Sequence, residues 1–223
     1  MTELPVIVVN FKAYREVEGT GSLDIAGMCE SVSKETGVLI AACPVTTELG
    51  YIARSVDIPV FSQNADPHSP GAFTGWVTPS MVKASGASGT LINHTEHKQS
   101  LELISETIKL CGIAGIVSLV CADTAELASR IAAHDPDIIA VEPPELIGGN
   151  VSVTDADPEI VRNTVRSVKM INERTAVFCG AGVKTGKDVK NALDLGADGV
   201  LLASGVVKAE DPRASLMDLV KYL

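Results

Sequence analysis

Short apolar runs alternate with amphipathic stretches from one end of the chain to the other. Most of the apolar runs lack polar alternation, which is typical of parallel strands that are covered on both faces. The pattern predicts eight strands, at residues 6–11, 38–42, 60–63, 90–93, 116–121, 138–141, 176–179 and 199–202.

The stretches between these runs have helical spacing. It predicts helices at residues 22–36, 99–110, 124–134, 157–172, 187–195 and 212–222, with weaker candidates at 80–85 and 48–55. Thr124 is a plausible N-cap, and Gly196 follows residue 195 as a C-terminal glycine does. Strands that alternate with helices favour an α/β fold, a single-domain (β/α)8 barrel of parallel strands over residues 1–223. The alternative is a doubly wound sheet, but no GxGxxG motif follows the first strand.

Composition and charge exclude several classes of partner. The formal net charge is −10, with 28 acidic and 18 basic residues and no basic run. A nucleic-acid surface needs a basic face, and so does binding to anionic membranes, so we expect neither partner. Because the overall field repels anions, a phosphate ligand must be held by local donors.

The five cysteines are scattered and never have CxxC spacing, which argues against a disulfide framework or a zinc ribbon. Cys43, Cys121 and Cys179 lie in apolar runs and are expected to be buried thiols. The first residues lack the pattern of a signal peptide, and no apolar segment approaches the ~20 residues that span a bilayer. We expect a soluble, cytoplasmic protein.

In such a barrel, residues just past the carboxyl ends of the strands form the active site. Glu142 follows the sixth strand and precedes Pro143, which pushes it to extended geometry. Gly148 and Gly149 follow closely and supply the backbone freedom of a moving flap. The segment predicts a fixed carboxylate base beside a hinged lid.

Two further strand ends carry polar groups. Asn10 and Lys12 lie two apart, so they point the same way in a strand, towards the barrel mouth if Phe11 packs outward. His94 looks like the start of a helix, where partial positive charge favours a neutral imidazole that can donate to a carbonyl. A metal site is the alternative. His94 and Glu96 form half a zinc-deaminase signature, but its cysteine pair is missing, so we expect no metal and no cofactor.

Glycine-bearing turns follow the last two strands, at residues 179–183 and 203–205. Loops in these two places of a barrel commonly bind phosphate through backbone N–H groups and a helix N-terminus. Together they predict a phosphate site.

As a set, these segments resemble the triosephosphate isomerase family, and its short archaeal branch most closely. The matching segments are Asn10-Phe11-Lys12, residues 71–75, Asn93-His94-Thr95-Glu96, residues 142–148, residues 179–182 and residues 199–205. The resemblance covers the whole chain in the right order. It implies a TIM barrel that interconverts dihydroxyacetone phosphate and D-glyceraldehyde 3-phosphate through an enediolate.

The resemblance also implies a role for each residue. Glu142 would be the base, His94 the electrophile at the carbonyl, and Lys12 the cation that balances the enediolate, positioned by Glu96. Asn10 would orient the substrate. The implied substrate and phosphate contacts are Asn10, Phe11, Lys12, Ile147, Gly148, Gly182, Ala203 and Ser204.

Two features of the resemblance concern loops. The lid would run from Pro143 to about Asn150, but Gly149-Asn150 departs from the family's usual Thr-Gly, so its second hinge is altered. The Gly71–Trp76 loop would reach a neighbouring subunit, which predicts a homodimer or homotetramer.

Other functions remain open from the residues alone. One is another phosphate-binding barrel isomerase, which would share the glycine turns but not the Lys, His and Glu set. Another is a non-catalytic phosphate-ligand sensor, which has no need of a base. A Schiff-base aldolase is disfavoured because the sixth strand contains no lysine.

Overall fold

All eight predicted strands are present in the computed structural model, which describes residues 4–143, 158–180 and 182–223. The strands are β1 (Ile7–Asn10), β2 (Ile40–Cys43), β3 (Phe61–Ser62), β4 (Gly89–Ile92), β5 (Val117–Ala122), β6 (Ile138–Val141), β7 (Ala176–Cys179) and β8 (Gly199–Leu202). Every pairing is parallel, in the order β2-β1-β8-β7-β6-β5-β4-β3. A parallel bridge between Ala42 and Val60 brings β2 beside β3 and closes the ring.

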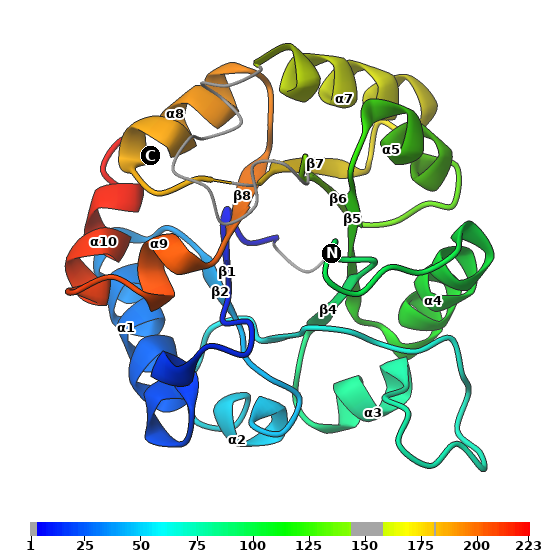
Figure 1. Cartoon of the computed structure of the whole chain (residues 1–223), viewed down its shortest axis with the longest axis horizontal. Coiled ribbons are helices and arrows are strands. Elements are labelled where there is room, and N and C mark those ends of the chain that lie inside the picture. Colours follow the sequence, from blue (N-terminus) through cyan, green and yellow to red (C-terminus); the bar gives the residue numbers. More distant parts are fainter. Residues whose placement is uncertain (1–3, 144–157, 181) are drawn as a thin grey trace.

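Helices surround this ring of strands, as Figure 1 shows. They are α1 (Thr20–Thr36), α2 (Leu49–Ile52), α3 (Pro79–Ala84), α4 (Leu101–Ala114), α5 (Ala125–Ala132), α7 (Pro158–Ile171), α8 (Gly186–Asp194), α9 (Ser204–Val207) and α10 (Pro212–Leu219), with a 3-10 turn η1 at Arg15–Val17. The (β/α)8 barrel predicted from the sequence is therefore confirmed. The 3-10 turn and α9 were not predicted, because neither is long enough to show a helical period.

Local sequence explains where the helices begin and end. The Thr124 hydroxyl accepts a hydrogen bond from the Leu127 N–H at 3.1 Å, as the predicted N-cap should. Gly196 has a φ of +96°, the left-handed geometry expected just past α8. Thr185 and Asp188 form a capping box that starts α8.

The strands bury both of their faces. One face fills the barrel interior, with Val8, Leu91, Leu119, Phe178 and Leu201 among its members. The other packs against the helices, where Ile7 and Val9 of β1 share one cluster with Val32 of α1 and Ile104 of α4. Adjacent strand residues therefore belong to opposite layers, which explains the absence of polar alternation in the sequence.

Glycines make room for the rings inside the barrel. A Cβ on Gly89 would lie 2.6 Å from the Phe61 ring, and one on Gly199 would lie 2.7 Å from the Phe178 ring. The interior is thus filled by side chains, so ligands can meet the barrel only at its ends.

All five cysteines are buried free thiols, which confirms the prediction for Cys43, Cys121 and Cys179 and extends it to Cys29 and Cys111. In the part of the chain that the structure describes, no helix is long and apolar enough to cross a membrane.

Candidate active site

The end of β1 brings Asn10 and Lys12 to one cavity, although not in the way the sequence predicts. The strand ends at Asn10, and Lys12 adopts a left-handed φ of +51°. This strained geometry is held because the Asn10 Oδ1 accepts the Lys12 N–H at 3.0 Å and Gln63 Nε2 donates to the Lys12 carbonyl at 3.0 Å. The prediction that both residues lie on one extended strand is wrong, but both side chains line the same cavity.

Phe11 lies between them and points the other way. Its ring is fully buried in the layer between the strands and the helices, which is the condition that the sequence analysis set for Asn10 and Lys12 to face the barrel mouth. Its N–H donates to the Cys43 carbonyl at 3.0 Å. This placement argues against direct contact between the Phe11 ring and a ligand.

His94 follows β4 in an irregular segment. The helix predicted to start beside it begins at Leu101, with Ser100 as N-cap, so a helix N-terminus cannot set its state. A backbone contact does so instead, because the Glu96 N–H donates to His94 Nδ1 at 3.1 Å. A ring nitrogen that accepts a hydrogen bond carries no proton, so this contact assigns a neutral imidazole with its proton on Nε2.

Glu142 directly follows β6 and is 5% exposed. Its N–H donates to the Ala122 carbonyl at 2.9 Å, and its side chain packs against Gly180 at the end of β7. The carboxylate oxygen Oε2 is buried, has no hydrogen-bond partner among the described residues and lies 3.7 Å from His94 Nε2. A buried acceptor without a partner is costly in a structural role, so this oxygen is available to a ligand.

The Cys121 thiol lies beside this carboxylate. Burial and the nearby negative charge of Glu142 together hold the pKa of the Cys121 thiol well above its ordinary value. The thiol therefore stays protonated and neutral next to Glu142.

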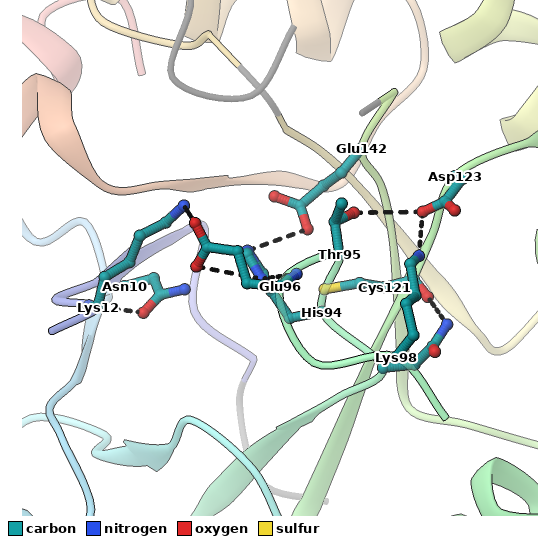
Figure 2. A network of polar contacts seen from close by, with 10 residues as sticks. Asn10, Lys12, His94, Thr95, Glu96, Lys98, Cys121, Asp123 and Glu142 are labelled. Atoms are coloured by element: carbon teal, nitrogen blue, oxygen red, sulfur yellow. Dashed lines mark hydrogen bonds and ion pairs between the residues drawn. The ribbon is translucent and has the colours of Figure 1, made fainter. Parts of the chain in front are cut away.

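Lys12 supplies the positive charge of the site. Its ammonium lies 2.8 Å from Glu96 Oε1, and its side chain is only 12% exposed, whereas that of Glu96 is 57% exposed. Figure 2 shows this pair beside His94 and Glu142. Strands β1, β4 and β6, far apart in sequence, thus bring an amine, an imidazole and a carboxylate to one rim of the barrel.

A cavity of about 690 Å³ opens at this rim. Its walls come from the ends of β1 and β4 and from the segment after β3, and they include Asn10, Lys12, Gln63, Asn64, Asp66, Trp76, His94, Glu96 and His97. A volume of this order suits a small polar molecule. Among the described residues, no group of three or more His, Cys, Asp or Glu side chains could hold a metal ion.

The two glycine turns lie against each other. Gly182 has a φ of +75°, and a Cβ on Gly205 would lie 3.1 Å from the Val183 carbonyl oxygen. Ala203 and Ser204 begin α9 at this contact. Ile147 and Gly148, predicted to contact phosphate, and the altered hinge at Gly149-Asn150 lie outside the described residues.

Comparisons with known proteins agree with this geometry. The family model for triosephosphate isomerase matches residues 5–223. The chain is 46% identical to the triosephosphate isomerase of Methanopyrus kandleri over 225 residues, which is 100% of each chain. It is 45% identical to those of Methanosarcina barkeri, over 99% of each chain, and of Methanocaldococcus jannaschii, over 98% of this chain and 100% of that one.

The chain belongs to the triosephosphate isomerase family. Members of this family are aldose–ketose isomerases that act on a small phosphorylated sugar. Membership supports the triosephosphate isomerase function that the resemblance implies, and it gives no support to a different barrel isomerase or to a phosphate sensor.

Three residues that shape this triosephosphate isomerase site received no individual role from the sequence. Gln63 holds the Lys12 turn, Asn93 links the His94 segment to β5 by donating to the Cys121 carbonyl at 2.9 Å, and Gly180 leaves space for Glu142. A signal for Asn93 was present, since Asn tolerates the left-handed φ of +59° that it adopts at the end of a strand. Gln63 and Gly180 act through contacts between strands, which no local pattern reveals.

Proposed function

We propose that this chain isomerises dihydroxyacetone phosphate and D-glyceraldehyde 3-phosphate with Glu142 as the base. The observation that carries the proposal is the buried, unpartnered Glu142 Oε2 that lies 3.7 Å from His94 Nε2. This oxygen takes the proton from the carbon next to the carbonyl, and the electron pair of the broken C–H bond moves to form an enediolate. His94 moves the hydroxyl proton of the first carbon to the former carbonyl oxygen, and the carboxylic acid of Glu142 returns a proton to the neighbouring carbon, which converts ketose to aldose.

His94 acts as the electrophile in this proposal. The hydrogen bond accepted at Nδ1 leaves the Nε2–H free to donate to the carbonyl oxygen as it gains negative charge. Because His94 is 6% exposed, little water competes for that donor.

Lys12 balances the charge of the enediolate. Its ammonium is fixed by Glu96 and by the turn that Asn10 holds, so it need not reorganise as the charge develops. Asn10 is 5% exposed and lines the same cavity, from which it orients the substrate.

The phosphate group binds at the paired glycine turns. Gly182, Ala203 and Ser204 offer backbone N–H groups there, and the family resemblance adds Ile147 and Gly148 from the lid. These donors act locally, which the negative charge of the protein requires.

Glu142→Asp tests the proposal, because it keeps the carboxylate and withdraws it by one methylene. We expect kcat to fall on the order of 10²-fold, while binding of inorganic phosphate changes little. Glu106→Asp is the matched control, since Glu106 lies on the exposed surface of α4. Wild-type turnover in the purified Glu142→Asp variant contradicts the assignment.

We also infer that the chain assembles into a homodimer or homotetramer through the Gly71–Trp76 loop. This loop lies between β3 and α3, and the segment that carries it projects beyond the ring of helices (Figure 1). Phe73 and Trp76 are 40% and 49% exposed, and both contact the His68 ring, with centroids 4.1 and 4.6 Å away. Burial in a partner accounts for aromatic side chains at such a tip. Light scattering that gives a stable, active monomer contradicts this inference.

A further inference from the structure

The segment between β4 and α4 carries both His94 and Glu96 but has no regular structure of its own. Its backbone makes one turn contact, from the His97 N–H to the His94 carbonyl at 2.7 Å. A loop of this kind is mobile unless side chains fasten it to the barrel. The position of His94 therefore depends on side-chain contacts at each end of the segment.

Asp123, which directly follows β5, provides two of these contacts. Its carboxylate accepts the Thr95 hydroxyl at 3.2 Å and forms an ion pair with the Lys98 ammonium. Thr95 lies between His94 and Glu96, and Lys98 lies two residues after Glu96. The Asp123 carboxylate therefore contacts the segment on both sides of Glu96 (Figure 2).

The tip of β5 also touches the strand that carries the base. The Ala122 carbonyl accepts the Glu142 N–H at 2.9 Å, and the Cys121 carbonyl accepts Asn93 Nδ2 at 2.9 Å. Three successive residues, Cys121 to Asp123, thus connect the His94 segment with Glu142. None of the three has a role in the proton transfer proposed above.

We propose that Asp123 is a positioning residue for the isomerisation. By pinning Thr95 and Lys98 to the end of β5, it sets the position of His94 Nε2 relative to Glu142 Oε2. This inference rests on the proposed function of those two groups. Its mechanism is geometric, because small displacements of a catalytic group from its working position slow the chemical step.

Two purely structural roles compete with this one. Asp123 precedes Thr124, the N-cap of α5, so its charge also stabilises the helix dipole. It also belongs to a partly exposed ion pair, which contributes little to stability. Both roles predict a change in stability without a change in kcat, and both predict that Asn and Ala at this position behave alike, since either substitution removes the charge.

The experiment compares Asp123→Ala, Asp123→Asn and Thr95→Val in the full chain. Asp123→Ala should lower kcat by about tenfold and leave KM within about twofold of wild type, because loss of the contacts to Thr95 and Lys98 displaces His94 without removing a substrate contact. Asp123→Asn keeps an acceptor for the Thr95 hydroxyl and should restore most of kcat. Thr95→Val removes the hydroxyl contact and leaves the Lys98 ion pair, so it should lower kcat by no more than Asp123→Ala does, and the double variant should add nothing to the loss in Asp123→Ala.

Asp194→Ala is the matched control, since Asp194 forms an ion pair with Lys190 on α8, remote from His94. It should leave kcat unchanged. If Asp123→Ala does not fold, Thr95→Val and Lys98→Met carry the test. Wild-type kcat in a folded Asp123→Ala or Thr95→Val variant overturns the proposal, and so do equal losses in Asp123→Ala and Asp123→Asn.

Failure of the proposed function itself has a different signature, namely a wild-type chain without isomerase activity. In that case the ring ¹⁵N NMR signals of His94 still report whether Asp123 positions the imidazole. They should shift in Asp123→Ala and stay unchanged in Asp194→Ala. Unchanged His94 signals in Asp123→Ala overturn the positioning role of Asp123, whether or not the protein is active.

Discussion

Gly180 at the end of β7 offers the sharpest test of how the barrel positions the base. In Gly180→Ala, the new Cβ would lie 3.0 Å from both Cγ and Oε1 of Glu142 and 2.9 Å from the Leu201 carbonyl oxygen. Ordinary contacts begin at 3.4 Å, so a gap of 0.4 Å (3.4 minus 3.0) must open on the Glu142 side. The Leu201 carbonyl belongs to β8 and yields less readily, which directs the displacement towards the carboxylate.

We expect kcat to fall by about tenfold or more, because a misplacement of 1 Å can cost about 10²-fold. KM should change less than kcat, since Gly180 is not itself one of the proposed phosphate donors. Overpacking should also lower the free energy of unfolding by about 1–3 kcal/mol. Steady-state kinetics with dihydroxyacetone phosphate and urea unfolding measure the two effects separately.

Two other glycine variants separate displacement of the base from general strain. Gly89→Ala overpacks the barrel against Phe61, so it should lower stability without an equal loss of kcat. Gly112→Ala lies in α4 with nothing within 4 Å of the new Cβ, so it should gain roughly 0.5–1 kcal/mol of stability and keep full activity. A Gly180→Ala enzyme that turns over at the wild-type rate refutes the reasoning.

Three further predictions follow from single contacts. Lys12→Met removes the ammonium that balances the enediolate and should lower kcat/KM on the order of 10²-fold, and a loss below about threefold in steady-state assays rejects that role. Thr185→Ala breaks the capping box of α8 and should lower the free energy of urea unfolding by about 1 kcal/mol with kcat unchanged, and an unaltered denaturation midpoint contradicts it. Burial raises the pKa of the Cys29 thiol from 9.0 to about 12. As the pH rises, the unfolded chain therefore loses this proton before the folded chain does. The free energy of unfolding should fall by about 1.4 kcal/mol per pH unit between pH 9.0 and about pH 12. In Cys29→Ala, the free energy of unfolding should fall less steeply with pH in this range, by about 1.4 kcal/mol per pH unit. Equal slopes for the wild-type and variant proteins contradict this prediction.

The order and type of the larger elements could be predicted because each strand is apolar on both faces and each longer helix is amphipathic. Those signals are local, and they survive in the barrel since packing follows them. The short α9 carries no such period, so the sequence did not predict it.

The site could be predicted in composition but not in detail. Lys12, His94 and Glu142 all follow strands, and parallel strands bring their carboxyl ends to one rim. The local contacts that position Lys12 and His94 were predicted wrongly from the sequence. Lys12 reaches the cavity through a left-handed turn rather than an extended strand, and His94 is kept neutral by a backbone N–H rather than by a helix.

These details depend on contacts between distant segments. Gln63 reaches the Lys12 carbonyl across 51 positions, and Asn93 reaches the Cys121 carbonyl across 28. No periodicity or spacing in one chain encodes such pairings, because each partner satisfies its local pattern equally well without the other.

The central claim is that Glu142 moves a proton between the two carbons of the substrate. Following dihydroxyacetone phosphate in heavy water by NMR tests it most directly, with wild-type protein and Glu142→Gln compared side by side. The account predicts deuterium at the reprotonated carbon of the product with wild-type protein, and loss of that conversion with Glu142→Gln. Conversion by Glu142→Gln at the wild-type rate, or a wild-type product without solvent deuterium, contradicts it.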